Sequence, residues 1–503
     1  MKVMKGFTTL DYILVVGYLL MIAAIGSSFY KRKSTAKDYF LGGRAMSWLP
    51  VGISLVAADL SAITVMGAPA WGFKHNLQLA LLSLGYPLMA PIVIKVFVPF
   101  YSRLNLYTAY EYLERRFSLP VRVLTSILFQ VLRGAHVAIV IYAPSLVINL
   151  VTGLPIWQCI LFMGGFTTFY TTLGGMKAVI WTDVIQFGVV SSGIFLIFIK
   201  AFTQIPGGAV GAFKAAAAAG KLDLINLAAD PTQLTTVWSL ILGGFVLSMA
   251  PVTTDQAIIQ RLFTTKSTKD CRQSIIVQSA IIVPIAFTLY LAGVALHLYY
   301  QARPGNLSGL TNPDAVMPFF AVHELPAGLS GLIIAAIFGA SMAVMSAGIN
   351  SLTTATTVDF YQRLFRPDAS AERLAAVGRV GTAAWGLAMT GLALFAGRLG
   401  ELVNAYNLIS SHISGPLLGI FLLAVLNKRA TPGGALIGAG AGLTVVTLVS
   451  SLTKWSFFYL GPIGLVVTFV TGHITSLLMS PPPPHKIKGL VLGQGEITSF
   501  RDR

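Results

Sequence analysis

Residues 53–72 read "ISLVAADLSAITVMGAPAWG", a stretch whose length and hydropathy predict a membrane-spanning helix. The same stretch contains Asp59 and the sequence Gly67-Ala68-Pro69, which is typical of a helix break. A carboxylate within a span is costly in free energy, so it is expected to face an interior cavity or a partner. The stretch therefore predicts a membrane helix that is interrupted around residues 57–61, with an acidic side chain at the interruption.

The composition of the whole chain predicts a membrane protein, because 55% of its 503 residues are hydrophobic and only 11% are charged. A soluble domain carries about a quarter charged residues. The fold class expected is an all-α polytopic membrane protein without a soluble enzyme domain. Apolar runs predict about thirteen transmembrane helices, at residues 10–30, 46–72, 76–102, 120–149, 156–174, 179–201, 236–260, 274–300, 327–361, 374–397, 402–426, 431–452 and 456–478.

Charge and cysteine content narrow the kinds of partner. The net charge is +17, but the basic residues lie between apolar runs instead of on one domain. This pattern favours contact with anionic lipids of the bilayer and argues against nucleic acid as a partner. Cys159 lies in a predicted span and Cys271 in a charged loop, so neither a disulfide framework nor a metal cluster is indicated.

The distribution of Lys and Arg predicts the orientation. Of 35 such residues, 24 lie in the loops after odd-numbered spans and in the C-terminal tail, and 9 lie on the opposite side. Basic residues are enriched in cytoplasmic loops. We therefore expect the N-terminus outside and the C-terminus in the cytoplasm of a bacterial-type inner membrane. The loop at 202–235 is expected to carry a short amphipathic helix on the outer face, and "SPPPPHKIKGL" is expected to form a stiff exit into the cytoplasm.

A second interruption is predicted in "LILGGFVLSMAPVTTDQ", at Gly243-Gly244 and Pro251. In transporters built from inverted repeats, two corresponding interrupted helices flank the substrate site near the middle of the membrane. The break positions predict six regions: a leading helix and basic loop at 1–45, a five-helix repeat at 46–201, an outer loop at 202–235, a second five-helix repeat at 236–426, two trailing helices at 427–480 and a cytoplasmic tail at 481–503.

Three further ionisable residues within predicted spans are candidates for a functional role. Asp183 opens the sixth span, and Arg133 and His136 lie in the fourth. Arg133 either braces the fold through an ion pair or binds an anion. His136 is either a neutral histidine bonded to a carbonyl or part of a proton relay.

Several stretches resemble the sodium/solute symporter family. "AIVIYAPSLVINLVTGLPIW" and "FTTFYTTLGGMKAVIWTDVIQ" are similar to the branch that holds the sodium/iodide, monocarboxylate and multivitamin cotransporters. "YTAYEYLERRF", "TTDQAIIQRLFTTKS" and "GLIIAAIFGASMAVMSAGINSLTTATTVDFY" are similar to bacterial sialic acid symporters of the same family. The similarity runs from about residue 10 to residue 480. It implies a leucine-transporter-type fold of inverted five-helix repeats, with one extra leading helix and two trailing helices.

The resemblance implies a sodium site between the broken helix and the ninth span. Backbone carbonyls of Ala57, Leu60 and Ala340 would coordinate the ion. The two hydroxyl residues that complete the family's site fall on Ala343 and Val344, which have no oxygen in their side chains. Two of the usual ligands are therefore missing from this chain.

Other residues near the ninth span are candidates for cation binding. Ser341 and Ser346 lie close to the missing hydroxyl positions. A second sodium site known in sialic acid symporters would use Asp183 and Ser346 here, but its other serine positions are Ala343 and Ala347. By the resemblance, this second site is also incomplete.

Three roles are open for Asp59. Its carboxylate can supply the oxygen and charge that the missing hydroxyls do not, it can take up a proton because burial favours the protonated acid, or it can form a salt bridge to Arg133. The coupling ion expected is Na⁺, with H⁺ as the alternative.

The substrate contacts are predicted from the sialic acid symporters. Similarity puts Ser61, Ala62 and Thr64 beside the ligand, and Ser83 at the position of a glutamine that helps to hold the sialate carboxylate. The fourth-span arginine of those symporters aligns on Arg133 or on His136. The complete set of predicted substrate residues is Ser61, Thr64, Ser83, Arg133, His136 and Gln256.

The sequence as a whole predicts a secondary transporter that imports a small organic solute by cation-coupled symport and alternating access. The solute is either an organic anion, such as a monocarboxylate or sialic acid, or a neutral sugar or polyol. A proton-coupled or uncoupled transporter, or a transporter-like solute sensor, is the alternative that the missing hydroxyls suggest. An enzyme is not expected, because the sequence contains no "HExxH" spacing and no evident nucleophile–base pair. The sequence does not indicate an oligomeric state.

Overall fold

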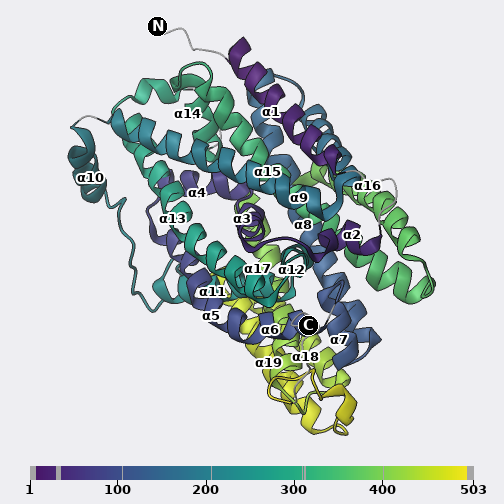
Figure 1. The fold of residues 1–503 in the computed structure, drawn as a ribbon. Coiled ribbons are helices and arrows are strands. Elements are labelled where there is room, and N and C mark those ends of the chain that lie inside the picture. The colour runs from purple at the N-terminus through teal and green to yellow at the C-terminus, as the bar shows by residue number, and fades with distance from the viewer. Residues whose placement is uncertain are drawn as a thin grey trace.

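The computed structural model describes residues 7–29, 35–104, 106–205, 207–308, 310, 313–399 and 402–494. Within these residues every regular element is a helix, and the one β-type contact is an isolated bridge between Met46 and Thr265 (Figure 1). The predicted all-α class is therefore confirmed for the described chain. The end of the predicted tail, residues 495–503, lies outside the described residues.

The first half of the chain contains α1 (Thr9–Ser28), α2 (Ala36–Leu41), η1 (Gly42–Arg44), α3 (Trp48–Asp59), α4 (Ala62–Lys74), η2 (Gln78–Leu84), α5 (Gly85–Ile92), η3 (Val93–Phe97), α6 (Val98–Leu104), α7 (Ala109–Arg116), α8 (Leu119–Thr152), α9 (Ile156–Thr203) and α10 (Gly208–Ala218). The second half contains α11 (Val237–Thr254), α12 (Gln256–Phe263), α13 (Thr268–Gln301), η4 (Pro304–Leu307), η5 (Pro313–Ala315), α14 (Val316–Glu324), α15 (Leu329–Ala355), η6 (Thr356–Phe365), α16 (Ala371–Ala396), η7 (Gly397–Leu399), α17 (Leu402–Leu426), α18 (Pro432–Leu452), η8 (Phe457–Tyr459), α19 (Leu460–Leu477) and η9 (Pro484–Lys486).

Ten helical segments of the described chain are long and apolar enough to cross a membrane, or eleven if the bent pair α3–α4 counts as one span. Each of the thirteen predicted segments is helical, but residues 156–174 and α16 are not among those eleven. Residues 156–174 form the first part of α9, which bends at Gly175, where φ is +61°. A polytopic helical protein is thus confirmed, while the number thirteen stays a prediction.

The predicted interruption in residues 53–72 is present. Helix α3 ends at Asp59, Leu60 leaves helical geometry with φ −86° and ψ 71°, and Ser61 is the N-cap of α4. The axes of α3 and α4 differ by 58°. Pro69 lies inside α4 without ending it, so the break is at Leu60 and Ser61 and not at the Gly-Ala-Pro sequence.

The second interruption exists, but the prediction of its position at Gly243-Gly244 and Pro251 was wrong. Helix α11 continues through these residues to Thr254, and the chain leaves helical geometry at Asp255, with φ −87° and ψ 118°. The two glycines instead allow close packing. A Cβ atom on Gly243 would lie 2.7 Å from the Phe458 carbonyl oxygen, and one on Gly244 would lie 2.7 Å from the Leu82 carbonyl oxygen.

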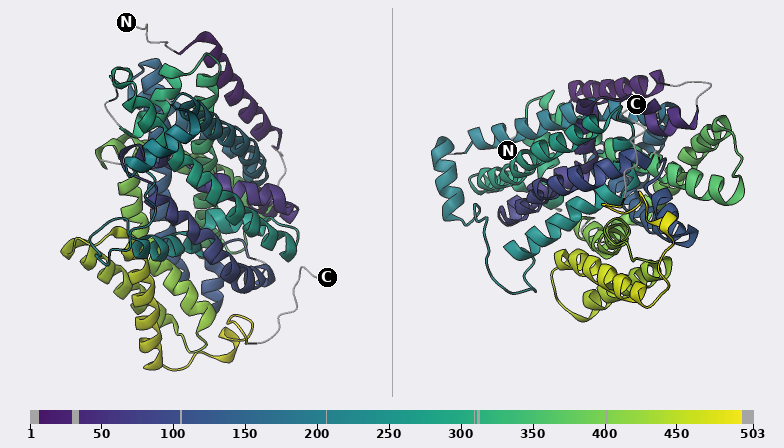
Figure 2. Two further views of the ribbon diagram at one scale, coloured as in Figure 1. Left: turned by 90° about the vertical axis from the view of Figure 1, so that its left-hand side faces the viewer. Right: turned by 60° about the horizontal axis from the view of Figure 1, so that its bottom comes forward.

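Helix α15 forms the centre of the molecule, since all of its residues except Leu329 and Leu332 are buried. It packs against α9, α8, α1 and α3. Figure 2 shows α1 (purple) on the opposite side of the molecule from α18 and α19 (yellow), which pack against α17. Helix α13 packs along α3 and α4, so the broken helix is held on both sides by long helices.

Two peripheral segments complete the fold. The predicted helix in the 202–235 loop is α10, which lies at the edge of the bundle against α9 and α13 (Figure 1). The C-terminal segment was expected to form a stiff exit from the membrane, but its described part folds back onto the bundle. Tyr112 Oη donates to the Leu490 carbonyl at 3.0 Å, and the Leu492 amide donates to the Val425 carbonyl at 2.8 Å. The described tail therefore covers α7 and the end of α17.

We expect Gly244→Ala to destabilise the protein, because the added methyl group would meet the backbone of Leu82 within 3 Å. Overpacking of this kind typically costs about 1–3 kcal/mol. The apparent Tm of purified protein in detergent, followed by size-exclusion fluorescence, should fall by several degrees. Gly165→Ala is the control, because no atom lies within 4 Å of a Cβ at that position. Equal Tm values for the two variants would contradict the packing described.

Candidate functional site

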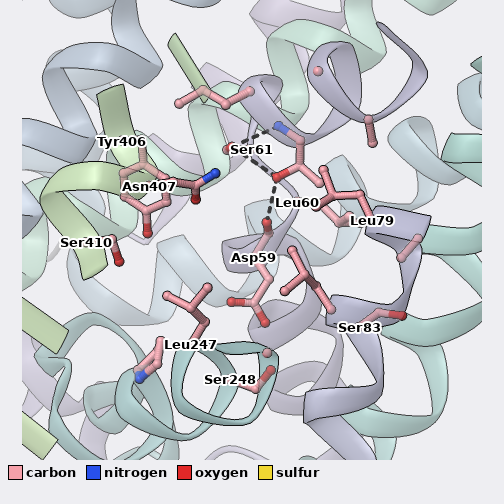
Figure 3. A pocket seen from close by; sticks show the side chains of 18 of the residues that line it. Asp59, Leu60, Ser61, Leu79, Ser83, Leu247, Ser248, Tyr406, Asn407 and Ser410 are labelled. Carbon is pink, nitrogen blue, oxygen red and sulfur yellow. Dashed lines mark hydrogen bonds between the residues drawn. The ribbon is translucent and has the colours of Figure 1, made fainter. Parts of the chain in front are cut away.

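A cavity of about 340 Å³ lies beside the break between α3 and α4. Figure 3 shows Asp59 near its centre, with Tyr406, Asn407 and Ser410 of α17 on one side and Leu79 and Ser83 of η2 on the other. The volume falls in the range of small-molecule sites. The cavity wall also includes residues from α5, α8, α11, α13, η5 and η8, so eight helical elements besides the broken helix contribute to it.

The cavity is reached from one face of the molecule. Its wall extends from Asp59 to Lys74 and His75 at the end of α4, and to Leu234 in the loop that follows α10. At the opposite end, hydroxyl groups of two tyrosines close the path: Tyr101 Oη donates to the Thr253 carbonyl at 2.5 Å and Tyr110 Oη donates to the Thr254 carbonyl at 2.9 Å. The face that carries α7 is thus sealed.

Gln256 belongs to this closed end and does not line the cavity, although it was predicted among the substrate residues. Its Nε2 donates to the Tyr107 carbonyl at 2.8 Å, and its Oε1 accepts from the Ala109 amide at 3.1 Å. The side chain is fully buried. Both of its polar atoms hold the start of α7 against the start of α12.

The backbone at the first break exposes two carbonyl groups. The Ser61 amide donates to the Asp59 carbonyl at 3.1 Å, so it does not complete the regular helical bond to Ala57. The Thr64 amide donates to Ser61 Oγ at 3.3 Å instead of to the Leu60 carbonyl. The oxygens of Ala57 and Leu60, which the resemblance assigns to sodium, are therefore released from the helical ladder.

The Asp59 carboxylate lines the cavity, and its Oδ2 accepts a hydrogen bond from Gln278 Nε2 of α13 at 2.7 Å. Among the described residues no ion pair of Asp59 with Arg133 is formed, because Arg133 pairs with Asp255. Asp59 therefore does not form the salt bridge to Arg133 that was one of its three possible roles. A carboxylate bound by neutral donors, here the Gln278 amide and the Tyr86 hydroxyl, keeps its negative charge available to a cation.

Arg133 and Asp255 form an ion pair at the wall of the cavity, through Nη2 and Oδ2. Asp255 Oδ1 also accepts from the Ala257 amide at 2.8 Å and so caps α12. Arg133 Nη1 lies 3.0 Å from His136 Nδ1. Since a guanidinium group can only donate, we assign Nδ1 as the acceptor, which leaves the His136 ring neutral with its proton on Nε2. The His136 ring stacks on Tyr406, with centroids 4.2 Å apart.

Five of the six predicted substrate residues line this one cavity: Ser61, Thr64, Ser83, Arg133 and His136. The sequence interpretation missed the contribution of α17, namely Tyr406, Asn407 and Ser410, and it missed Gln278 of α13. Asp255 was also missed. The sequence contained a signal for it, since this carboxylate lies at the end of an apolar run that was already predicted to be interrupted.

The other predicted cation residues lie away from the cavity wall. Ala340, Ser341 and Ser346 are buried in α15, and Asp183 is buried in α9. Ser346 Oγ donates to the Ala343 carbonyl at 3.1 Å. In the described chain, Ser341 Oγ and Asp183 Oδ1 are buried without a hydrogen-bond partner. These residues are thus separate from the solute cavity, although α15 packs against α3.

Asp183 already has a cationic partner. Its Oδ2 accepts from Arg261 Nη2 at 2.8 Å and from the Ser54 hydroxyl, and neither charged side chain is exposed. Arg261 Nε also donates to Ser54 Oγ at 2.7 Å. The pair joins α9 to α12 and to α3, so its role here is to connect helices. Among the described residues no group of three or more His, Cys, Asp or Glu side chains is arranged to hold a metal ion.

A bundle of membrane helices with an interrupted helix beside a one-sided cavity defines a secondary transporter of the leucine-transporter-type fold. The chain matches the profile described as "Sodium:solute symporter family" over residues 39–442. It therefore belongs to this family, as the resemblance predicted.

Curated relatives are similar over most of their length. The sodium/sialic acid symporter NanT of Aliivibrio fischeri is 32% identical over 475 residues, which cover 94% of each chain. The sodium-coupled monocarboxylate transporter 1 of Homo sapiens is 32% identical over 445 residues, which cover 87% of this chain and 73% of the relative. Both are transporters rather than enzymes.

Solved structures agree with this membership. A structure described as the substrate-bound outward-open state of a Na⁺-coupled sialic acid symporter superimposes with a TM-score of 0.90 and 30% identity, covering 95% of this chain and 99% of that one. A nucleobase-cation-symport-1 family transporter superimposes with a TM-score of 0.58 at 13% identity, covering 87% and 93%, and this likeness concerns the fold alone.

We expect Arg261→Gln to destabilise the fold more than the double variant Asp183→Asn/Arg261→Gln. Removal of one partner leaves a buried unpaired charge, which typically costs about 3–5 kcal/mol, whereas removal of both does not. The apparent Tm of the single and double variants in detergent measures the difference. Arg272→Gln, at an exposed position of α13, is the control. A double variant as unstable as the worse single variant would show that the pair does not act as a unit.

Proposed function

We propose that this protein is a sodium-coupled symporter that imports a small organic solute by alternating access. The observation that carries the proposal is the break at Leu60 and Ser61, which releases the Ala57 and Leu60 carbonyls from the helical ladder and places Asp59 and Leu60 on the wall of the cavity. Oxygen atoms at an unwound turn are what a travelling Na⁺ needs. In this proposal the unwound turn binds the ion, and the cavity beside it binds the solute.

The proposed orientation has the N-terminus outside and the C-terminus in the cytoplasm of a bacterial-type inner membrane. The excess of Lys and Arg on one side supports it. In this orientation the cavity faces outward, and the bonds made by Gln256 and Tyr110 close the cytoplasmic side. Inward opening would break these bonds. The repeats proposed at 46–201 and 236–426 each begin with an interrupted helix, which supports a movement of one bundle against the other.

Sodium is the proposed coupling ion because the named relatives are sodium-coupled. In the site proposed here, the carbonyls of Ala57, Leu60 and Ala340 coordinate Na⁺, and Asp59 supplies the charge. Asp59 would thereby replace the hydroxyls absent at Ala343 and Val344. Coupling to H⁺ is the second candidate, because the same carboxylate can carry a proton.

The solute is proposed to occupy the cavity beside Ser61, Thr64, Ser83 and His136. The names of the relatives make an organic anion one class to test. The hydroxyl-rich wall makes a neutral sugar or polyol the other.

Uptake of labelled solutes into proteoliposomes should exceed the outside concentration when a Na⁺ gradient is imposed. An H⁺ gradient alone, or no gradient, should give at most equilibration. Accumulation under H⁺ alone would replace sodium with proton coupling, and equilibration under all three conditions would exclude symport.

Asp59→Asn should abolish accumulation driven by Na⁺, because the amide keeps the size of the side chain but removes the charge. We expect at least a tenfold loss in the initial rate of uptake. Glu372→Gln, at an exposed position in the first turn of α16, is the matched control. Full activity of Asp59→Asn would remove this residue from the coupling mechanism.

Ala343→Ser together with Val344→Thr should increase the apparent affinity for Na⁺ several-fold, since two coordinating hydroxyls would be added next to the proposed site. The measurement is the Na⁺ concentration that gives half-maximal uptake. Ala355→Ser, at the far end of α15, controls for a general effect of a new hydroxyl in this helix. An unchanged half-maximal concentration would place the sodium site elsewhere.

A further inference from the structure

The Arg133–Asp255 pair determines which solutes the cavity can accept. Of the five charged side chains that line the cavity, Asp59, Arg133 and Asp255 lie at the two helix breaks, whereas Lys74 and Asp314 lie at the end of α4 and in η5. Arg133 is the cation that an anionic solute would need. Its position and bonds therefore decide whether an anion can be recognised.

Two of the five N–H donors of the Arg133 guanidinium are engaged, and both of its terminal nitrogens have a partner. Nη2 donates to Asp255 and Nη1 to His136, while Nε is buried without a partner among the described residues. The side chains of Arg133 and Asp255 are only 8% and 9% exposed. A solute carboxylate would have to compete with Asp255 for the charge of this guanidinium.

Asp255 is held too firmly to be displaced at low cost. Its second oxygen caps α12 through the Ala257 amide, and its backbone forms the second helix break. Displacement would remove the cap from α12 and leave a buried carboxylate without its cation. Both changes are unfavourable.

The charge balance points in the same direction. Arg133 and Asp255 neutralise one another, and His136 is neutral, so Asp59 leaves one negative charge in the deep cavity. One Na⁺ at the break would bring this charge to zero. A carboxylate solute would then add an uncompensated negative charge in a region of low dielectric, where like charges repel strongly.

The remaining wall suits an uncharged solute with several hydroxyl groups. Ser61, Ser83, Ser248, Asn407 and Ser410 contribute neutral polar groups, and His136 offers an Nε2 donor. Hydroxyl and amide groups both donate and accept, as sugar hydroxyls do. The stacked rings of His136 and Tyr406 add a flat surface.

We propose that Asp255 is a specificity-determining residue that holds Arg133 out of reach of anions, so that the solute is an uncharged polyhydroxylated compound of the sugar or polyol class. This inference rests on the proposed function, since it names the solute of the same cavity. It requires no contact between Asp255 and the solute.

The test is equilibrium binding to the purified full-length protein in detergent with saturating Na⁺, measured by calorimetry without any gradient. The carboxylate probes are N-acetylneuraminate, pyruvate and L-lactate, and the neutral probes are D-glucose, D-galactose, D-mannitol and myo-inositol. In the wild type, carboxylates should bind at least tenfold more weakly than the best neutral probe. Asp255→Asn, which frees Arg133, should bind a carboxylate at least tenfold more tightly than the wild type.

Two further variants make the outcome unambiguous. Asp270→Asn removes a carboxylate outside the cavity and should not increase carboxylate binding. If Asp255→Asn does not fold, the double variant Arg133→Gln/Asp255→Asn removes the pair and should retain the neutral probe without gaining a carboxylate. The proposal is overturned if the wild type binds a carboxylate as tightly as Asp255→Asn does, or if folded Asp255→Asn gains no carboxylate binding.

Failure of this inference is distinguishable from failure of the proposed function. Binding preference is read at equilibrium, whereas sodium-coupled transport is read from the accumulation of the bound probe in proteoliposomes. A protein that binds and accumulates a carboxylate with Na⁺ would retain the symport function and lose the inference. A protein that binds a neutral probe without accumulating it would retain the inference and lose symport.

Discussion

The unwound turn at Leu60 and Ser61 is the constraint on which the rest of the structure depends. Backbone polar groups inside a bilayer must be satisfied by protein or must face a polar cavity. Here the Ser61 hydroxyl accepts from the Thr64 amide and the Thr64 hydroxyl donates to the Asp59 carbonyl at 3.3 Å. These bonds satisfy part of the turn and leave the Ala57 and Leu60 carbonyls available. An unwound turn at this depth therefore requires a polar cavity beside it.

Three buried arginines of the described chain form ion pairs with aspartates on other helices or at their ends. Arg133 binds Asp255, Arg261 binds Asp183, and Arg122 binds Asp359 at 2.6 Å. Each pair joins segments that are far apart in the chain. Asp59 differs, because its carboxylate accepts hydrogen bonds from neutral groups, the Gln278 amide and the Tyr86 hydroxyl. The charge of Asp59 is therefore the one that the deep cavity offers to a cation.

The second break connects the cavity to its closed end beside α7. Asp255 forms the break and faces the cavity through its pair with Arg133, while the next residue, Gln256, binds the backbone at the start of α7. One short segment thus contacts both regions. A movement of α12 would alter the wall of the cavity and its closed end together, which is the coupling that alternating access requires.

The sequence by itself determined the helical membrane fold, the first broken helix and five of the residues that line the cavity. These features follow from hydropathy, helix-breaking residues and family motifs, all of which are local in the chain. It did not determine the position of the second break, where Gly243 and Gly244 provide close packing and Asp255 leaves the helix. Only the tertiary structure decided that Arg133 is held by Asp255 and that α17 forms one wall, because such partners are chosen by contacts between helices that are distant in sequence.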